Sequence, residues 1–258
     1  MSNCYKNFPV KINYSDSSVD TIYGNSSSLS ENLNIEHAES IGVKGSSAVF
    51  TNSIPKGDLS VDSYLIDDLG VYNNLKGSND QKLTINFGPY TCPSPCVMSS
   101  MSIDIRVGEP ITIQRTFNYF GEVSTGESPV PTNPDLKPIV PENVSLSGFD
   151  ALGGVENITS INWSFSQEYN EHYLLGNPTP IISFGQGQIS LNIEGEGLTN
   201  PLVSENCISS PELYNITVSG CGGQSLGTLS VSGHMESRSS SVSSESDEVN
   251  SVSIIQYL

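Results

Sequence analysis

Residues 101–114 read MSIDIRVGEPITIQ, and this segment indicates an antiparallel β-hairpin. Apolar Met101, Ile103, Ile105 and Val107 alternate with polar residues, a Gly108-Glu109-Pro110 turn follows, and Ile111 and Ile113 resume the alternation. A period of two places every second side chain on the same face of a strand. We therefore expect one face of this hairpin to pack on a core and the other to meet water or a partner.

The same alternation recurs along the chain, at Leu83/Ile85/Phe87, Ile161/Trp163/Phe165 and Ile189/Leu191/Ile193. Helical periodicity is weak, and its best short matches are residues 30–40 and 167–175. The sequence therefore predicts a mainly β protein with short helices.

Residues 121–141 contain five of the prolines, Pro129, Pro131, Pro134, Pro138 and Pro141, among Gly, Ser and Thr. Proline lacks the N–H donor of a sheet ladder and fixes φ, so this stretch is typical of a linker. We expect it to separate two β domains, residues 1–120 and 142–258.

Three short matches between these halves suggest a tandem duplication. Glu31-Asn32-Leu33 matches Glu156-Asn157-Ile158, Gly57–Asp62 matches Gly187–Asn192, and Leu83-Thr84-Ile85 matches Ile216-Thr217-Val218. Their offsets of 125, 130 and 133 residues grow along the chain, as insertions in the loops of the second copy would produce. The alternative is two unrelated β segments of similar composition.

Composition excludes several classes of function. The 258 residues hold 10 Lys+Arg against 28 Asp+Glu, a net charge of -18, which argues against binding to a phosphate backbone. No apolar run reaches the ~20 residues of a membrane helix, and the first residues lack the pattern of a secretory signal. The 5 cysteines are odd in number and irregularly spaced, so we expect unpaired thiols rather than disulfides or a metal site.

No catalytic constellation is recognisable in the sequence, and we expect neither an enzyme nor a cofactor. Only 3 histidines are present, and there is no nucleophile elbow, phosphate loop or zinc-protease motif. Glu168, Glu171 and His172 lie near one another, but a polar break between strands explains them as well as a hydrolytic site does.

The polar faces of the predicted strands carry acidic residues. If Leu59, Val61, Ile189, Leu191 and Ile193 point inward, the opposite face presents Asp58, Asp62, Asn192, Glu194 and Glu196. Such a face is usually only solvated, and the functional alternative is a surface that repels polyanions. The polar interval 65–81, with Asp67, Asp68, Gly70 and Asp80, is long for a connection between strands, and loops of that length are often functional.

Residues 157–197 carry a resemblance to a known family. A strand over 158–166 is followed by a polar break at 167–171, by Tyr173-Leu174-Leu175-Gly176, by Pro178 and Pro180, and by a strand over 188–194. This order resembles that of the tail tube (major tail) proteins of tailed bacteriophages, and the hairpin 101–119, ending in Phe120-Gly121, is similar to later strands of the same domain. The similarity covers about half of the chain and includes no diagnostic motif.

The resemblance implies β-sandwich or barrel domains that pair edge to edge into trimeric pseudo-hexameric or hexameric rings. Stacked rings would form the conduit for phage DNA, which passes without specific binding. Asp58, Asp62, Glu194 and Glu196 would then face the lumen, and Asp67, Asp68, Gly70 and Asp80 would belong to an inter-ring arm. Partners would be further copies and sheath, terminator or baseplate proteins, with the chain in the virion tail after assembly in the host cytoplasm and no membrane involved. Tail terminators, baseplate hubs and distal tail rings are related possibilities.

A β-sandwich module that binds a receptor or carbohydrate, in a virion protein or adhesin, is the alternative function. Such modules present exposed aromatic side chains, whereas the single tryptophan, Trp163, falls at an inward position of its strand. Tyr169 and Tyr173 remain available for such a patch.

Overall fold

The computed structural model describes residues 8–32, 35–39, 46–51, 55–66, 83–126, 138–149, 152, 155–175, 179–196, 198, 211–220, 225–243 and 246–258. These residues form a mainly β protein, as predicted. The helices within them are short 3-10 segments, including η1 (Pro141–Asn143) and η3 (Val155–Asn157).

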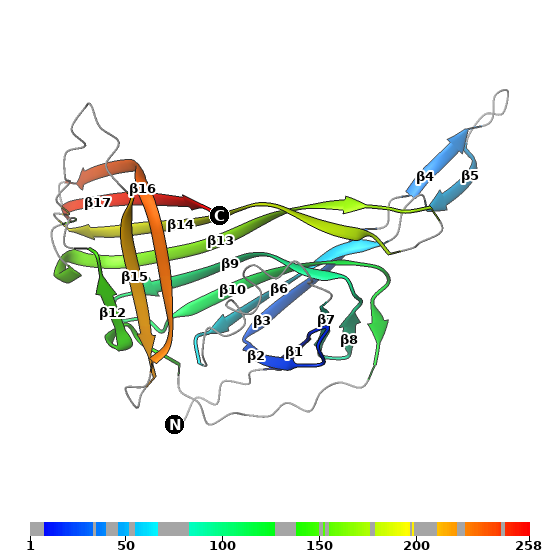
Figure 1. Ribbon diagram of the computed structural model, residues 1–258, viewed down its shortest axis with the longest axis horizontal. Coiled ribbons are helices and arrows are strands. Elements are labelled where there is room, and N and C mark those ends of the chain that lie inside the picture. The colour runs from blue at the N-terminus through cyan, green and yellow to red at the C-terminus, as the bar shows by residue number, and fades with distance from the viewer. Residues whose placement is uncertain are drawn as a thin grey trace.

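A broad antiparallel layer, here called the long layer, dominates the molecule (Figure 1). Its strands follow the order β16-β17-β14-β13-β9-β10-β6-β3 across the sheet. Their bounds are β3 Ser26–Asn32, β6 Lys56–Tyr64, β9 Cys96–Arg106, β10 Thr112–Phe120, β13 Ile158–His172, β14 Ile181–Glu196, β16 Ser225–Ser243 and β17 Ser246–Tyr257.

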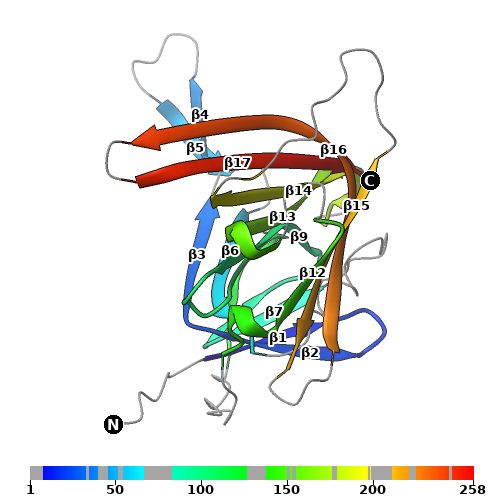
Figure 2. The same cartoon turned by 90° about the vertical axis from the view of Figure 1, so that its left-hand side faces the viewer.

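Two smaller groups of strands cover the inner side of the long layer. One is a five-stranded sheet in the order β11-β8-β7-β1-β2. The other consists of β12, β15 and the first part of β16, which pairs with β15 up to Gly233, bends, and pairs with β17 from His234 onward (Figure 2). The bounds are β1 Phe8–Asn13, β2 Val19–Gly24, β7 Thr84–Phe87, β8 Tyr90–Cys92, β11 Ser124–Thr125, β12 Val144–Ser147 and β15 Glu212–Ser219. A separate pair, β4 (Ile35–Glu39) and β5 (Ser46–Thr51), completes the described strands.

The first and second halves of the chain repeat one strand order. In the long layer the first half contributes β9-β10-β6-β3 and the second half contributes β16-β17-β14-β13. In each half, the order across the sheet therefore begins with the last hairpin of that half, β9-β10 or β16-β17, and continues to its earlier strands. The covering strands repeat as well, because β8-β7-β1 corresponds to the first part of β16 followed by β15 and β12.

Two of the three predicted sequence matches fall on equivalent strands. Gly57–Asp62 lies on β6 and Gly187–Asn192 on β14, while the third match joins β7 to β15. The first match is wrong. Ser30 pairs with Asp58 and Ser166 pairs with Gln188, so Glu31 corresponds to Gln167 rather than to Glu156.

The halves meet within one sheet rather than only through a linker. β9 pairs with β13, and one cluster of buried apolar residues includes side chains from both halves. The proline-rich segment also contributes to the fold where it is described. Its Ser124–Thr125 forms the edge strand β11, and the backbone of Ile139 bonds to Leu65 and Ile111.

The predicted helices at 30–40 and 167–175 are wrong, because the described residues of the first lie in strands and Gln167–His172 of the second belongs to β13. Ser26–Asn32 pairs with β6, and Ile35–Glu39 pairs with β5. The predicted polar break is also absent, since β13 continues to His172 and pairs with β14 through that stretch. Pairing with a neighbouring strand overrides a weak local helical pattern, and such partners lie far away in the sequence.

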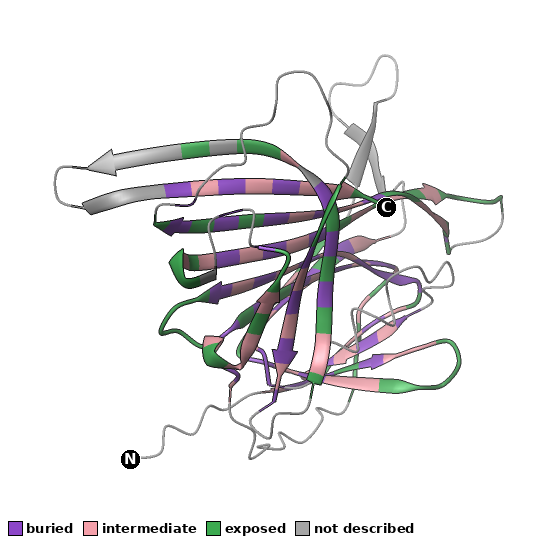
Figure 3. Cartoon of the chain, turned by 60° about the vertical axis from the view of Figure 1, so that its left-hand side comes forward, coloured by how far each residue is buried: buried purple, intermediate pink, exposed green. Residues whose placement is uncertain are grey.

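The period-two pattern itself is confirmed. Leu59, Val61, Ile189, Leu191 and Ile193 are all fully buried, and so is Trp163 at 0% exposure. Figure 3 shows buried bands alternating with exposed or intermediate ones along the long strands. The apolar face of each long strand therefore packs inward, and its polar face forms the opposite surface.

We predict that Cys92 and Cys96 resist alkylation until the protein unfolds. Both are buried, unpaired thiols, and burial raises the pKa of Cys92 from 9.0 to about 12 and that of Cys96 in the same direction. The thiolate is the reactive form, so the native protein should react far more slowly than the unfolded chain. With Cys4, Cys207 and Cys221 replaced by serine, iodoacetamide labelling at pH 8 with and without urea measures this difference. Because the unfolded thiols ionise first, stability is complete below about pH 9 and is expected to fall as pH rises toward 12.

Candidate functional site: the outer face, the arm and the free edges of the long layer

The surface of the long layer that faces away from the core, here called the outer face, is rich in small polar side chains. One row across the sheet illustrates its composition. The pairing register connects Ser26, Asp62, Gln114, Ser102, Ser164 and Ser190 in that order. These side chains are exposed or half-buried, so the face is a continuous polar surface over six strands.

Hydrogen bonds between neighbouring strands order this face. The Ser26 hydroxyl donates to Asp62 Oδ2 at 2.7 Å, and the Gln114 amide donates to Asp62 Oδ1 at 2.9 Å. Ser164 Oγ and Ser190 Oγ lie 2.7 Å apart. Further along, Ser30 donates to Asp58 at 2.6 Å and Ser160 donates to Glu194 at 2.9 Å. Such cross-strand pairs hold short side chains flat against the sheet.

The outer face is acidic. The four residues predicted for an acidic face, Asp58, Asp62, Glu194 and Glu196, all lie on it, and the structure adds Asp104. Asp104 pairs with Arg106 at 2.9 Å. Asp62, Asp104, Gln114 and Asn162 line a shallow depression of about 310 Å³. Asp104 was not among the residues predicted for this face, although its polar position in the alternation Met101/Ile103/Ile105 indicates it.

The predicted inter-ring residues Asp67, Asp68, Gly70 and Asp80 lie outside the described residues. Their role in contacts between rings therefore stays a prediction.

A two-stranded arm extends from one end of the long layer. It consists of Gln167–His172 of β13 paired with Ile181–Gly187 of β14, and it projects beyond the neighbouring strands (Figure 1). A register shift between Gln167 and Tyr169 marks its base. Phe120 packs edge-on against Tyr169, with ring centroids 5.9 Å apart, which anchors the arm to the end of β10.

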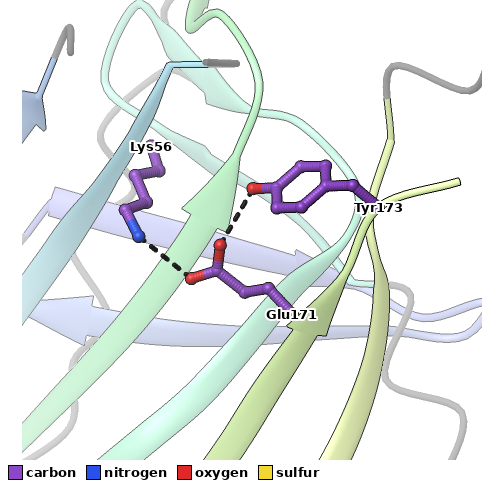
Figure 4. A network of polar contacts seen from close by, with 3 residues as sticks. All are labelled: Lys56, Glu171 and Tyr173. Atoms are coloured by element: carbon purple, nitrogen blue, oxygen red, sulfur yellow. Dashed lines mark hydrogen bonds and ion pairs between the residues drawn. The ribbon is translucent and has the colours of Figure 1, made fainter. Parts of the chain in front are cut away.

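A polar network fixes the arm further along. Lys56 Nζ lies 3.1 Å from Glu171 Oε1, and the Tyr173 hydroxyl donates to Glu171 Oε2 at 2.9 Å (Figure 4). Partial desolvation of its hydroxyl and the hydrogen bond to Glu171 raise the pKa of Tyr173 to about 12, so Tyr173 stays a neutral donor although its ring is exposed. His172 Nε2 lies 2.9 Å from Ser183 Oγ within the arm. Glu171 and His172 thus have partners that orient the arm.

The end of the arm is apolar and exposed, and the opposite end of β13 borders a groove. Leu174 is 55% and Leu175 108% exposed, and Tyr173 and Ile181 are exposed as well. The groove, of about 460 Å³, lies beside the first residues of β13 and is lined by Ile105, Val107, Val144, Leu146, Ile158 and Ile161 among others. An exposed apolar cluster and an apolar groove thus lie at the two ends of one strand.

A second depression of about 200 Å³ lies where the arm meets the outer face. Asp58, Asn118, Lys56 and Tyr169 line it. Tyr119 and Phe120 also line it but are buried, as is Trp163 elsewhere, so Tyr169 is the aromatic side chain of this depression that could stack on a sugar.

Two edges of the long layer lack a partner strand among the described residues. β3 pairs only with β6, and the part of β16 that follows Gly233 pairs only with β17. All pairings between these edges are antiparallel, and the order contains the eight strands β16, β17, β14, β13, β9, β10, β6 and β3. The two free edges consequently run in opposite directions.

Among the described residues, no group of three or more His, Cys, Asp or Glu side chains is placed to hold a metal ion. In the same part of the chain, no helix is long and apolar enough to cross a membrane. No family model matches this chain, and none of the curated proteins matches it either.

Proposed function

We propose that this chain is a structural tail tube subunit whose copies close into rings and stack into a conduit for phage DNA. The observation that carries the proposal is the long layer. It is a repeated four-strand unit with a buried inner face, an acidic polar outer face and, within the described part of the chain, an unpaired edge on each side. Exposed sheet edges normally lead to unwanted pairing between chains. Two such edges on a single chain therefore favour a protein that assembles through them.

The dimensions of the layer suit a closed ring of three copies. Three copies supply ~24 strands, and a spacing of ~4.8 Å gives a perimeter of about 115 Å and a diameter of about 37 Å before strand tilt widens it. Such a barrel is wide enough for a DNA duplex. Because each chain contains the unit twice, a trimer would have pseudo-hexameric symmetry, as the resemblance implies.

The charge of the outer face suits the lumen of such a barrel. Asp58, Asp62, Glu194 and Glu196 carry the same charge as the phosphates of DNA, and the surrounding side chains are mainly Ser, Thr and Asn. A lumen that attracted phosphates would bind DNA through counterion release, whereas an acidic one lets it slide.

Stacking of the rings is supported by the two ends of β13. A copy displaced along the strand direction would bring its exposed Leu174 and Leu175 toward the apolar groove of the next copy. Contacts between two different surfaces propagate into a filament instead of closing. The anchored arm holds the apolar cluster in place for this contact.

Negative-stain microscopy of the purified protein tests the proposal. We expect rings of uniform bore, and tubes at higher protein concentration. Monodisperse monomers under all conditions would contradict it. Monomers that also bind glycans would instead support the carbohydrate-binding alternative, with the depression at Tyr169 as the first place to examine.

A further inference from the structure

We infer that neighbouring copies join by antiparallel pairing of β3 with β16, in the register that β13 and β9 adopt within one chain. This places Ser28 of one copy directly opposite Ser237 of the partner subunit. The inference deepens the proposed function and rests on it, because it specifies how one copy in a ring meets the next.

The junction between the halves provides the template. Within each half, the strand order runs β9-β10-β6-β3 or β16-β17-β14-β13. The outermost strand of the second half, β13, pairs with the outermost strand of the first half, β9. The free strands β3 and β16 occupy these same two positions in their own halves, and they run in the same directions as β13 and β9, respectively. A repeat of the junction between chains therefore pairs β3 with β16.

Equivalent residues follow from the pairing registers. Asp62 of β6 matches Asn192 of β14, Ser60 matches Ser190, and these residues pair with Ser28 on β3 and Ser164 on β13. Ser28 therefore corresponds to Ser164.

The other side of the junction is derived in the same way. Gln114 of β10 pairs with Asp62 and Ser253 of β17 pairs with Asn192, so these two residues correspond. Their partners are Ser102 on β9 and Ser237 on β16. Ser237 therefore corresponds to Ser102, and Ser164 lies opposite Ser102 within the chain. Transferred to two copies, Ser28 lies opposite the partner's Ser237.

The inner side of β3 explains why the free edge is tolerated. Where β13 buries Ile161, Trp163 and Phe165 against β9, the corresponding residues are Asn25, directly before β3, and Ser27 and Leu29 on β3. Asn25 and Ser27 are exposed in the single chain. Polar residues on an edge strand limit unspecific pairing. The β3–β16 junction between copies is therefore weaker than the β13–β9 junction within a chain, and it forms only with the correct partner strand.

Thiol cross-linking tests the register. The variant Ser28→Cys/Ser237→Cys, in a chain with Cys4, Cys207 and Cys221 replaced by serine, is assembled and treated with a short bismaleimide. Directly opposite Cβ atoms lie ~5 Å apart, so we expect links between chains up to a closed ring, at least about tenfold faster than for Ser60→Cys/Ser237→Cys, which are two strands apart. Ser102→Cys/Ser164→Cys is the matched control and should link within one chain.

The outcomes separate the two proposals. Rings that form without links between Ser28→Cys and Ser237→Cys, or that link faster through a pair shifted along β3, would overturn the register and leave the tube function standing. A chain that links internally through Ser102→Cys/Ser164→Cys but forms no assembly would overturn the tube function itself.

Discussion

Proline at one of two adjacent positions of β3, Ser27 or Ser28, is expected to abolish ring formation while leaving the chain folded. In an antiparallel strand, the N–H groups of successive residues point to opposite edges. One of these two residues therefore directs its N–H toward β6 and the other toward the free edge. Proline removes the N–H and blocks further pairing on its side. We expect Ser27→Pro and Ser28→Pro to behave differently, although they differ by one position.

The comparison between the two variants contains its own control. The variant with the outward N–H removed should keep the unfolding midpoint of the parent protein and remain monomeric in light scattering and microscopy. The other variant should lower the unfolding midpoint, because it breaks a bond between β3 and β6. Rings of normal size from both variants would show that β3 does not take part in assembly.

Charge reversal on the outer face should turn the assembled protein into one that holds DNA. Asp62→Lys together with Glu194→Lys replaces two carboxylates of the proposed lumen by ammonium groups in every copy, and a ring would multiply this change. We expect assembly to persist, because both side chains lie on the exposed face and accept only hydrogen bonds between exposed groups. DNA affinity should rise by about a hundredfold or more at low salt and fall steeply as salt is added, since each phosphate contact releases counterions.

Fluorescence anisotropy with a short labelled duplex, repeated over a series of salt concentrations, measures the effect. The control is Asp16→Lys/Glu122→Lys, which changes the net charge equally at exposed positions between strands, away from the outer face. Equal DNA binding by both double variants would mean that net charge alone determines the affinity and that the outer face does not line the path of the DNA. In a complete particle, the lumen variant should also slow genome release.

The strands and their faces were predictable from the sequence, because burial on one side imposes a period of two. The alternation at Met101–Ile105 correctly placed the inner and outer faces of its strand, whereas Val107, predicted to face inward, is 71% exposed at the end of the hairpin. The alternation at Leu59/Val61 and at Ile189/Leu191/Ile193 placed Asp58, Asp62, Glu194 and Glu196 on the outer face. The repeat was visible at Gly57–Asp62 because a central strand with a buried face tolerates few changes. It was misplaced at Glu31 because an edge strand such as β3 tolerates many.

The arrangement of the strands was not predictable from local patterns. Nothing near Ile161 indicates that β13 pairs with β9, because strand partners are chosen over long sequence separations. The arm was mistaken for a helix for the same reason, since Gln167–His172 is held by Ile181–Gly187 and by Lys56 and Phe120 rather than by its own sequence. The free edges of β3 and β16 became recognisable only once the whole order of the sheet was known.

The joining of both halves through β9 and β13 also has a kinetic consequence. In a closed ring of such chains, every second junction between four-strand units lies within one chain and forms before any two molecules meet. The covalent connection keeps the two strands of that junction at high effective concentration. Fewer bimolecular encounters are then needed to complete the circle, and less translational and rotational entropy is lost at each closure. Because β13 and β9 pair within one chain, their junction can bury large apolar side chains such as Trp163 without exposing them to other molecules. The same side chains on a free edge strand would promote unspecific pairing, and the corresponding positions at β3 are mostly polar.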